Sequence, residues 1–151
     1  MKLLRLKLYT ALLWTALAAT PPYSAFSVEV QGKGPAMFLI PGATNPADVW
    51  RETAARYSDR YRVHLFTLAG YAGVPPLSNP HILPEIKRQL INYIKENQSP
   101  GSVLIGHSIG GFLGLWLATE AEDLPDKMVI VDALPFLAAA QSPSINAEQA
   151  R

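Results

Sequence analysis

Short apolar runs alternate along this chain with longer stretches of mixed polarity. Runs that are mainly apolar predict strands buried within a sheet, and they occupy residues 36–40, 103–105 and 127–131. Residues 26–31 alternate between apolar and polar positions, which predicts a half-exposed edge strand. Residues 62–67 predict one more strand.

Helical patterns fill the gaps between these strands. Asn45 is placed to cap a helix that begins with Pro46 and runs to about Tyr57. A second helix is expected over about residues 83–97, and a third from Ser108 to about Glu120. In the second helix, the stripe Ile86, Leu90, Tyr93 and Ile94 predicts the buried side, and Lys87, Arg88, Lys95 and Glu96 are expected to face water.

The alternation of strands and helices predicts the α/β class, with a mostly parallel sheet and helices on both faces. In such a sheet the loops that follow the carboxyl ends of the strands meet at one edge, and ligands bind there. Residues 41–45, the Gly- and Pro-rich loop 68–80, Ser108 and Asp132 follow these ends. We expect them to share one rim of a single domain over residues 26–136, followed by an Ala- and Pro-rich tail, 137–151, without a clear element.

The chemistry is concentrated in Gly106-His107-Ser108-Ile109-Gly110, a match to G-x-S-x-G between a strand and a helix. That context is typical of a nucleophile elbow, in which a strained turn presents the serine hydroxyl at the start of a helix. Gly106 and Gly110 lack a Cβ, so the strand and the helix can approach closely. The free N–H groups of a helix start favour negative charge, which makes the Ile109 N–H a candidate oxyanion donor. The competing interpretation is a Gly-rich turn with an incidental serine.

Four segments together resemble the α/β-hydrolase superfamily of the serine-nucleophile type. They are the elbow, Phe38-Leu39-Ile40-Pro41-Gly42-Ala43, the step from Val49-Trp50 through residues 61–71, and Val129-Ile130-Val131-Asp132-Ala133. The resemblance covers about residues 27–136 and only the N-terminal half of that fold, so we expect the chain to stop before the last strands. It implies Ser108 as nucleophile and the backbone N–H groups of Ala43 and Ile109 as the oxyanion hole. Pro41 replaces the family's usual histidine, which should matter little for a backbone donor.

The resemblance also implies an acid and then a histidine after the serine, and here the chain departs from the family. Its histidines, His64, His81 and His107, all precede Ser108. We expect structural roles for His64 in its strand and for His107 beside the elbow, and an exposed loop position for His81. Asp132 is a weak candidate for the triad acid, because a carboxylate that caps the following turn is the simpler interpretation.

Composition narrows the remaining function classes. The net charge is +1, no cysteine is present, and basic residues do not cluster beyond the N-terminus, so we expect neither disulfides nor a nucleic-acid partner. P-loop and dinucleotide motifs are absent and metal-ligand types are not clustered, so we expect no cofactor and no metal. The expected partner is a small-molecule ester or related acyl substrate. Val74, Leu77 and Ile82 favour an apolar acyl or alcohol group, and the oligomeric state is open.

Residues 1–25 have the layout of a secretory signal peptide. Lys2, Arg5 and Lys7 precede an apolar stretch over residues 8–19, and Ala16-Leu17-Ala18 offers a cleavage motif. An uncleaved signal anchor is the alternative, although the apolar stretch is shorter than the roughly 20 residues that a membrane span needs. We therefore expect an exported protein, periplasmic or secreted, with no membrane span in the mature chain.

Two hypotheses for the function follow from these patterns. In the first, the chain belongs to a serine hydrolase, Ser108 attacks an ester or similar acyl bond, and a histidine outside this sequence acts as the base. In the second, the chain is a catalytically inactive fragment or binding protein that keeps half of the fold.

Overall fold

A computed structural model describes residues 23–120, 124–135, 142, 144–146 and 148. Most of the expected leader and most of the expected tail therefore lie outside the described residues. Within the described part, no helix has both the length and the apolar character needed to cross a membrane.

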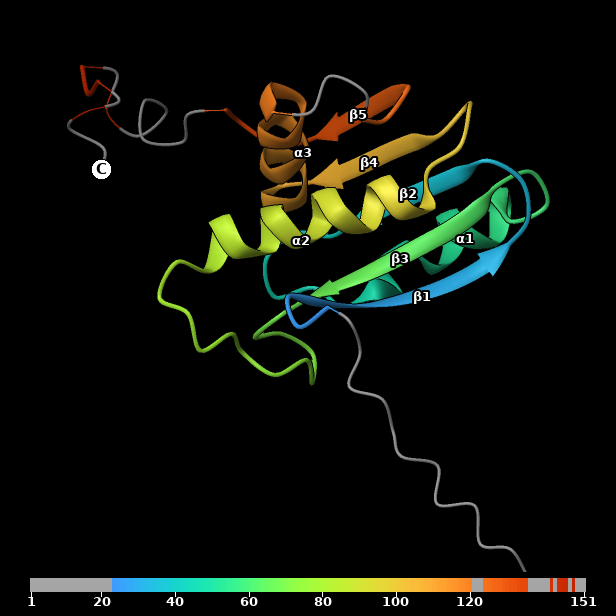
Figure 1. The fold of residues 1–151 in the computed structure, drawn as a ribbon, viewed down its shortest axis with the longest axis horizontal. Helices are drawn as coiled ribbons and strands as arrows, with labels where there is room; N and C mark the ends of the chain where they lie inside the picture. Colours follow the sequence, from blue (N-terminus) through green and yellow to red (C-terminus); the bar gives the residue numbers. More distant parts are fainter. Residues whose placement is uncertain (1–22, 121–123, 136–141, 143, 147, 149–151) are drawn as a thin grey trace, which may run out of the picture.

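The described residues form one mixed sheet with the strand order β1-β3-β2-β4-β5 (Figure 1). β1 (Phe26–Gly32) pairs antiparallel with β3 (Arg62–Leu68), and the other neighbouring strands pair in parallel. These other strands are β2 (Ala36–Ile40), β4 (Val103–His107) and β5 (Lys127–Val131). Each predicted strand is present within two residues of its expected bounds, and the α/β class is confirmed.

Helices cover both faces of the sheet, as the alternation predicted (Figure 1). The short 3₁₀ helix η1 (Ala47–Trp50) and α1 (Arg51–Tyr57) lie on one face, and α2 (Ile82–Asn97) and α3 (Ile109–Glu120) lie on the other. Because side chains alternate along a strand, β2 supplies both cores. Met37 and Leu39 pack on the α1 side, and Phe38 and Ile40 pack under α2 and α3.

The start of the first helix differs from the prediction. Pro46, not Asn45, takes the position before η1, and no side chain of that position bonds the helix. The N–H of Ala47 instead donates to Thr67 Oγ1 on β3, at 2.8 Å. A local capping pattern could not reveal this acceptor, because it lies 20 residues further along the chain.

β5 is less buried than its apolar sequence predicted. Met128 and Ile130 are half-buried under α3, whereas Val129 and Val131 are 46% and 40% exposed. The burial alternates because β5 is the last strand of the described sheet and α3 covers only one of its faces. The expectation of a fully buried strand was therefore wrong.

α2 confirms the predicted apolar stripe and corrects one residue beside it. Ile86, Leu90, Tyr93 and Ile94 are all buried. Lys87, which was expected to face water, leaves only 12% of its side chain exposed. Its Nζ lies 4.1 Å from the centre of the Trp116 ring on α3 and pairs with the Glu120 carboxylate. A lysine stem covers apolar surface readily when its charged end finds such partners.

Tyr23 to Ala25, which the sequence pattern placed in the leader, pack against α2. The N–H groups of Ser24 and Ala25 donate to Gln89 Oε1 at 2.8 and 3.0 Å. The Tyr23 ring stacks on Phe26 at a centroid distance of 5.3 Å, and Ala25 is fully buried. The packed unit thus extends at least to Tyr23.

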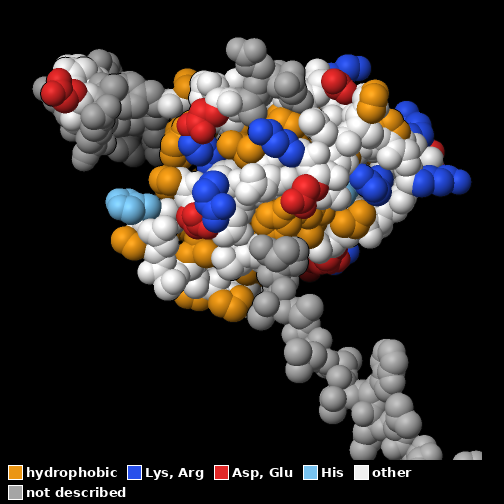
Figure 2. Space-filling view, viewed as in Figure 1, with side chains coloured by type: hydrophobic (Ala, Val, Ile, Leu, Met, Phe, Trp, Pro, Cys, Tyr) orange, Lys and Arg blue, Asp and Glu red, His pale blue; other side chains and the backbone are white. Residues whose placement is uncertain are grey.

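Charges of both signs share the molecular face that carries α2. Figure 2 shows Lys and Arg side chains interspersed with Asp and Glu side chains and with apolar patches on this face. Such a mixture produces no broad field of one sign, in keeping with the net charge of +1.

Replacing Gln89 by alanine should destabilise the fold through this N-terminal anchor. The buried N–H of Ala25 and the partly buried N–H of Ser24 lose their acceptor. A buried unsatisfied donor costs about 1–3 kcal/mol, so we expect a loss of about 2 kcal/mol in the free energy of unfolding. Urea unfolding followed by circular dichroism measures it. Arg88→Ala is the matched control: it removes only a surface ion pair with Glu85 and should cost less than about 1 kcal/mol. Equal losses in the two variants would contradict the anchoring role.

Candidate active site

Ser108 occupies the turn between β4 and α3 that the G-x-S-x-G pattern predicted. Its φ is 52°, in the left-handed region that a residue with a Cβ adopts at a cost of about 1–3 kcal/mol. The Ser108 N–H donates to the Val131 carbonyl and its own carbonyl accepts from the Phe112 N–H, both at 2.9 Å. α3 begins at the next residue, Ile109. Backbone hydrogen bonds on both sides therefore hold a strained serine directly before a helix start.

Two glycines allow the backbones around Ser108 to touch. A Cβ at Gly106 would lie 2.4 Å from the Gly110 carbonyl oxygen, and a Cβ at Gly110 would lie 2.4 Å from the Ile40 carbonyl oxygen. These neighbours are backbone atoms and cannot rotate away as a side chain can. The close approach of β4, α3 and the end of β2 thus requires glycine at both positions, as the motif spacing predicted.

The segment after β2 carries the second expected oxyanion donor. The Asn45 N–H donates to the Gly42 carbonyl at 3.3 Å and closes a turn around Ala43, which is exposed. Among the described residues, the backbone N–H groups of Ala43 and Ile109 have no hydrogen-bond acceptor. The first turn of α3 packs against the start of this segment, since a Cβ at Gly110 would lie 2.7 Å from the Pro41 carbonyl oxygen. Free amides of this kind are what an oxyanion hole requires.

A small apolar cavity of about 160 Å³ opens beside Ile109. The end of β3, the following loop and the first turns of α2 form its walls, and they include Tyr71, Leu77, Ile82 and Ile86. Leu77 and Ile82 were expected from the sequence to shape an apolar site, and the structure places both here. The rim therefore combines Ser108, free backbone amides and an apolar cavity.

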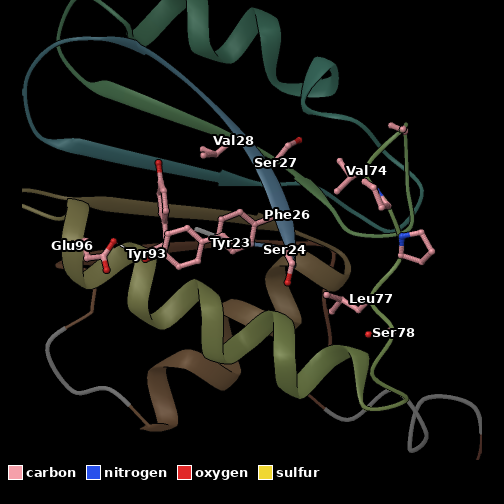
Figure 3. Close-up of a pocket in the computed structure, with 14 residues that line it drawn as sticks. Tyr23, Ser24, Phe26, Ser27, Val28, Val74, Leu77, Ser78, Tyr93 and Glu96 are labelled. Atoms are coloured by element: carbon pink, nitrogen blue, oxygen red, sulfur yellow. Dashed lines mark hydrogen bonds between the residues drawn. The ribbon is translucent and has the colours of Figure 1, made fainter. Parts of the chain in front are cut away.

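A larger groove of about 990 Å³ lies on the same face of the sheet, away from the elbow (Figure 3). Neither Ser108 nor Ile109 borders it. Val74, which the sequence pattern grouped with Leu77 and Ile82, faces this groove and not the small cavity, whereas Leu77 borders both. The groove had no sequence signal, because its walls meet only in the folded chain: Tyr23, Phe26 and Val28 near β1, Tyr93 and Glu96 on α2, and residues 72–78.

His64 lies in the core and far from Ser108. It pairs across the sheet with Phe38, which pairs with Leu104, so two strand spacings and four residues separate it from the serine, roughly 16 Å. Its ring is 1% exposed, and Nδ1 lies 2.7 Å from the Tyr93 hydroxyl. Burial, helped by the positive charge of Arg62, lowers the pKa of His64 to about 4. The structural role expected for this histidine fits its position.

The other two histidines also take the positions expected from the sequence. The His107 ring packs on the turn after β2, since a Cβ at Gly42 would lie 2.9 Å from its Nδ1. His81 is exposed just before α2, and its N–H donates to Asn79 Oδ1 at 2.8 Å. Neither ring forms a hydrogen bond with the Ser108 hydroxyl within the described part of the chain.

Asp132 follows β5 at the same rim, with an exposed side chain and a φ of 47°. Its carboxylate forms no hydrogen bond or ion pair with another described residue, so neither a turn cap nor a contact to a histidine is made there. In the same part of the chain, no group of three or more His, Asp or Glu side chains is arranged to hold a metal ion.

The sequence profile of the alpha/beta hydrolase family matches residues 37–150 of this chain. The chain belongs to the alpha/beta hydrolase family. The matched region begins within β2 and includes the turn around Ala43, the Ser108 turn and β5, which are the parts that form the rim described above.

Curated relatives of this alpha/beta hydrolase include methyl ester esterases from Vibrio and Aeromonas. The chain is 32% identical over 111 residues to the pimeloyl-[acyl-carrier protein] methyl ester esterase of Vibrio cholerae, with 74% of this chain and 42% of the relative covered. It is 30% identical over 122 residues to the enzyme of the same name from Aeromonas hydrophila, with 79% of this chain and 46% of that one covered. The chain thus spans less than half the length of the curated relatives it matches.

Solved structures share the fold of this alpha/beta hydrolase at low sequence identity. A hydrolase from Pseudomonas aeruginosa superposes with a TM-score of 0.67 at 19% identity, over 77% of this chain and 45% of that one. An epoxide hydrolase from Bacillus megaterium superposes with a TM-score of 0.69 at 15% identity, over 79% of this chain and 44% of that one. At these identities the likeness concerns the fold alone.

Gly110→Ala should destabilise the fold far more than Gly114→Ala, although both glycines lie in α3. A Cβ at Gly110 meets a backbone carbonyl, whereas at Gly114 the nearest atom, at 3.0 Å, is the end of the Leu104 side chain. Overpacking costs about 1–3 kcal/mol, and alanine is favoured over glycine in a helix by about 1 kcal/mol. Because the helix preference applies to both variants, the overpacking at Gly110 sets the difference, and we expect the free energies of unfolding to differ by about 1–3 kcal/mol in urea titrations. Similar values for both variants would show that the elbow tolerates a Cβ.

Acid should destabilise the fold through His64. The unfolded histidine binds a proton near its ordinary pKa of 6.5, but the folded one only near 4, so stability is lost as the pH falls between these values. From pH 7 to pH 5 the parent chain should lose about 2 kcal/mol more than the non-titrating His64→Gln variant. Urea unfolding of both chains at each pH measures the difference. Parallel pH profiles would show that His64 is not held neutral by burial.

Proposed function

We propose that this alpha/beta hydrolase is a serine hydrolase that cleaves an ester or related acyl bond through Ser108. The observation that carries the proposal is the strained serine directly before α3, with free backbone N–H groups at the next residue, Ile109, and at Ala43 in the segment after β2. Strain at a residue with a Cβ persists where the surrounding packing imposes it, often at catalytic turns. The names of the curated relatives, which are methyl ester esterases, support an ester as the substrate.

In the proposed reaction, the Ser108 hydroxyl oxygen attacks the carbonyl carbon of the bound ester while a base accepts its proton. The carbonyl oxygen becomes negatively charged in the tetrahedral intermediate and accepts hydrogen bonds from the Ala43 and Ile109 amides. The positive end of the α3 dipole stabilises the same charge. The alcohol then leaves with a proton, and water hydrolyses the acyl-serine in a second, equivalent attack.

The proposal assigns the base to a histidine outside these 151 residues. His64 is buried and bonded to Tyr93, His107 packs on Gly42, and His81 is exposed before α2. None of these rings is placed to accept the proton of Ser108. Asp132 stays a weak candidate for the acid, because it lies at the correct rim but has no histidine beside it.

A fluorophosphonate probe, which forms a covalent bond with activated serines, tests the proposal. We expect the native protein from its source to be labelled at Ser108, and the Ser108→Ala variant to lose at least about 99% of the label, in line with the several powers of ten that an intact catalytic group contributes. Peptide mass spectrometry locates the labelled residue. Ser78→Ala, which removes an exposed loop serine, is the control and should keep full labelling.

The isolated 151-residue chain separates the two hypotheses about this polypeptide. Labelling only in a longer native protein would support a base outside the chain. Labelling of neither form at Ser108 would contradict the serine-hydrolase proposal and favour a catalytically inactive binding protein.

A further inference from the structure

We propose that the small cavity beside Ile109 is a selectivity pocket for an uncharged apolar chain of about six carbons. The Leu77 side chain closes the far end of this pocket and so limits the length of the bound chain. The inference rests on the proposed function and deepens it. It names the substrate class as esters that carry a medium-length apolar acyl or alcohol group.

The position of the cavity connects it to the reacting serine. Ile109, which borders the cavity, is the residue after Ser108 and carries one of the proposed oxyanion donors. The cavity thus begins one residue from the serine, and the proposal places the carbonyl end of a bound chain at the elbow.

The lining determines what kind of chain fits. The side chains that enclose the cavity are mainly apolar, among them Leu77, Ile82, Leu83 and Ile86. Among the residues that the structure describes, no charged side chain lines it. Burying a carboxylate or an ammonium group among such walls is strongly unfavourable without a partner. The preferred group is thus a hydrocarbon chain with no charge at its far end.

The volume of the cavity limits the length of that chain. The cavity holds about 160 Å³. An apolar protein cavity of about 150 Å³ binds benzene, which has six carbons. A butyl group leaves part of this space empty, and a decyl group exceeds it.

Leu77 separates the small cavity from a much larger one. Leu77 and Pro76 border both the cavity and the groove of about 990 Å³ that Figure 3 shows between β1, α2 and the loop. Hydrogen bonds within the loop hold this wall in place: the Gly70 N–H donates to the Val74 carbonyl at 3.0 Å, and the Val74 N–H donates to the Tyr71 carbonyl at 2.9 Å. Truncating Leu77 should therefore join the two spaces.

Binding of methyl esters to the Ser108→Ala variant tests the pocket without turnover. Methyl butanoate, methyl hexanoate and methyl decanoate are titrated into the protein and followed by methyl NMR. Each buried methylene should tighten binding about fourfold, so hexanoate should bind about 15-fold more tightly than butanoate. Decanoate should bind no more tightly than hexanoate. The largest shifts should belong to Leu77, Ile82, Ile86 and Ile109.

Leu77→Ala, added to the same background, tests the wall. This substitution should tighten the binding of methyl decanoate at least about tenfold relative to Ser108→Ala alone, because the acyl chain can then continue into the groove. Val74→Ala is the matched control: it removes apolar atoms from the same loop but borders only the groove, so the preference for hexanoate should stay.

Two results would contradict the proposal that this cavity is a selectivity pocket. One is affinity that rises steadily from butanoate to decanoate in the parent, and the other is shifts centred on Val74 and Tyr93 instead of Ile109. The titrations of the three methyl esters into Ser108→Ala decide between these outcomes even if the added Leu77→Ala substitution prevents folding. Binding does not require an activated serine, so a normal chain-length limit without fluorophosphonate labelling would overturn only the serine-hydrolase proposal.

Discussion

The backbone-to-backbone contact among β4, α3 and the end of β2 is the constraint on which the rest of the site depends. Gly106 and Gly110 place main-chain atoms where any Cβ would overlap a neighbouring carbonyl. This contact forces the chain to turn sharply at Ser108 and gives the serine its positive φ. It also brings the first turn of α3 against the segment that carries Ala43. The strain at Ser108 and the close approach of α3 to the segment after β2 are thus two consequences of one packing arrangement.

The core under α3 supplies the energy that keeps this turn strained. Leu104, Leu113 and Leu117 are fully buried between the sheet and the helix. Each such side chain contributes about 1.5–3 kcal/mol by leaving water, which together exceeds the cost of about 1–3 kcal/mol for the left-handed serine. Lys87 adds a link from α2 through Trp116 near the other end of α3. The helix that positions the serine is therefore fixed along its length.

The sequence predicted those features whose causes are local. The period of apolar residues located the strands and α2, and the glycine spacing located the turn at Ser108, since each depends on residues a few positions apart. The predictions failed where a residue's environment depends on a partner that is distant in the sequence. Thr67 caps η1 from the next strand, Trp116 draws Lys87 out of water, and the position of β5 in the sheet leaves Val129 exposed. The cavity beside Ile109 likewise needs three segments to meet before it exists.

The same distinction explains why one part of the proposed catalytic site has a sequence signature and the other does not. The turn at Ser108 and the two free amides consist of backbone, so they require small residues at fixed spacing, and that spacing can be recognised. An acid and a base require only that a side chain reach one point in space, from any segment that the fold brings there. Asp132 lies at the rim but has no partner among the described residues. None of the three histidines hydrogen-bonds Ser108, and His64 is bonded to Tyr93 in the core. The segment from Ala36 to Glu120 therefore supplies the strained serine and the free backbone amides, while proton transfer in the proposed reaction depends on a side chain that no local pattern specifies.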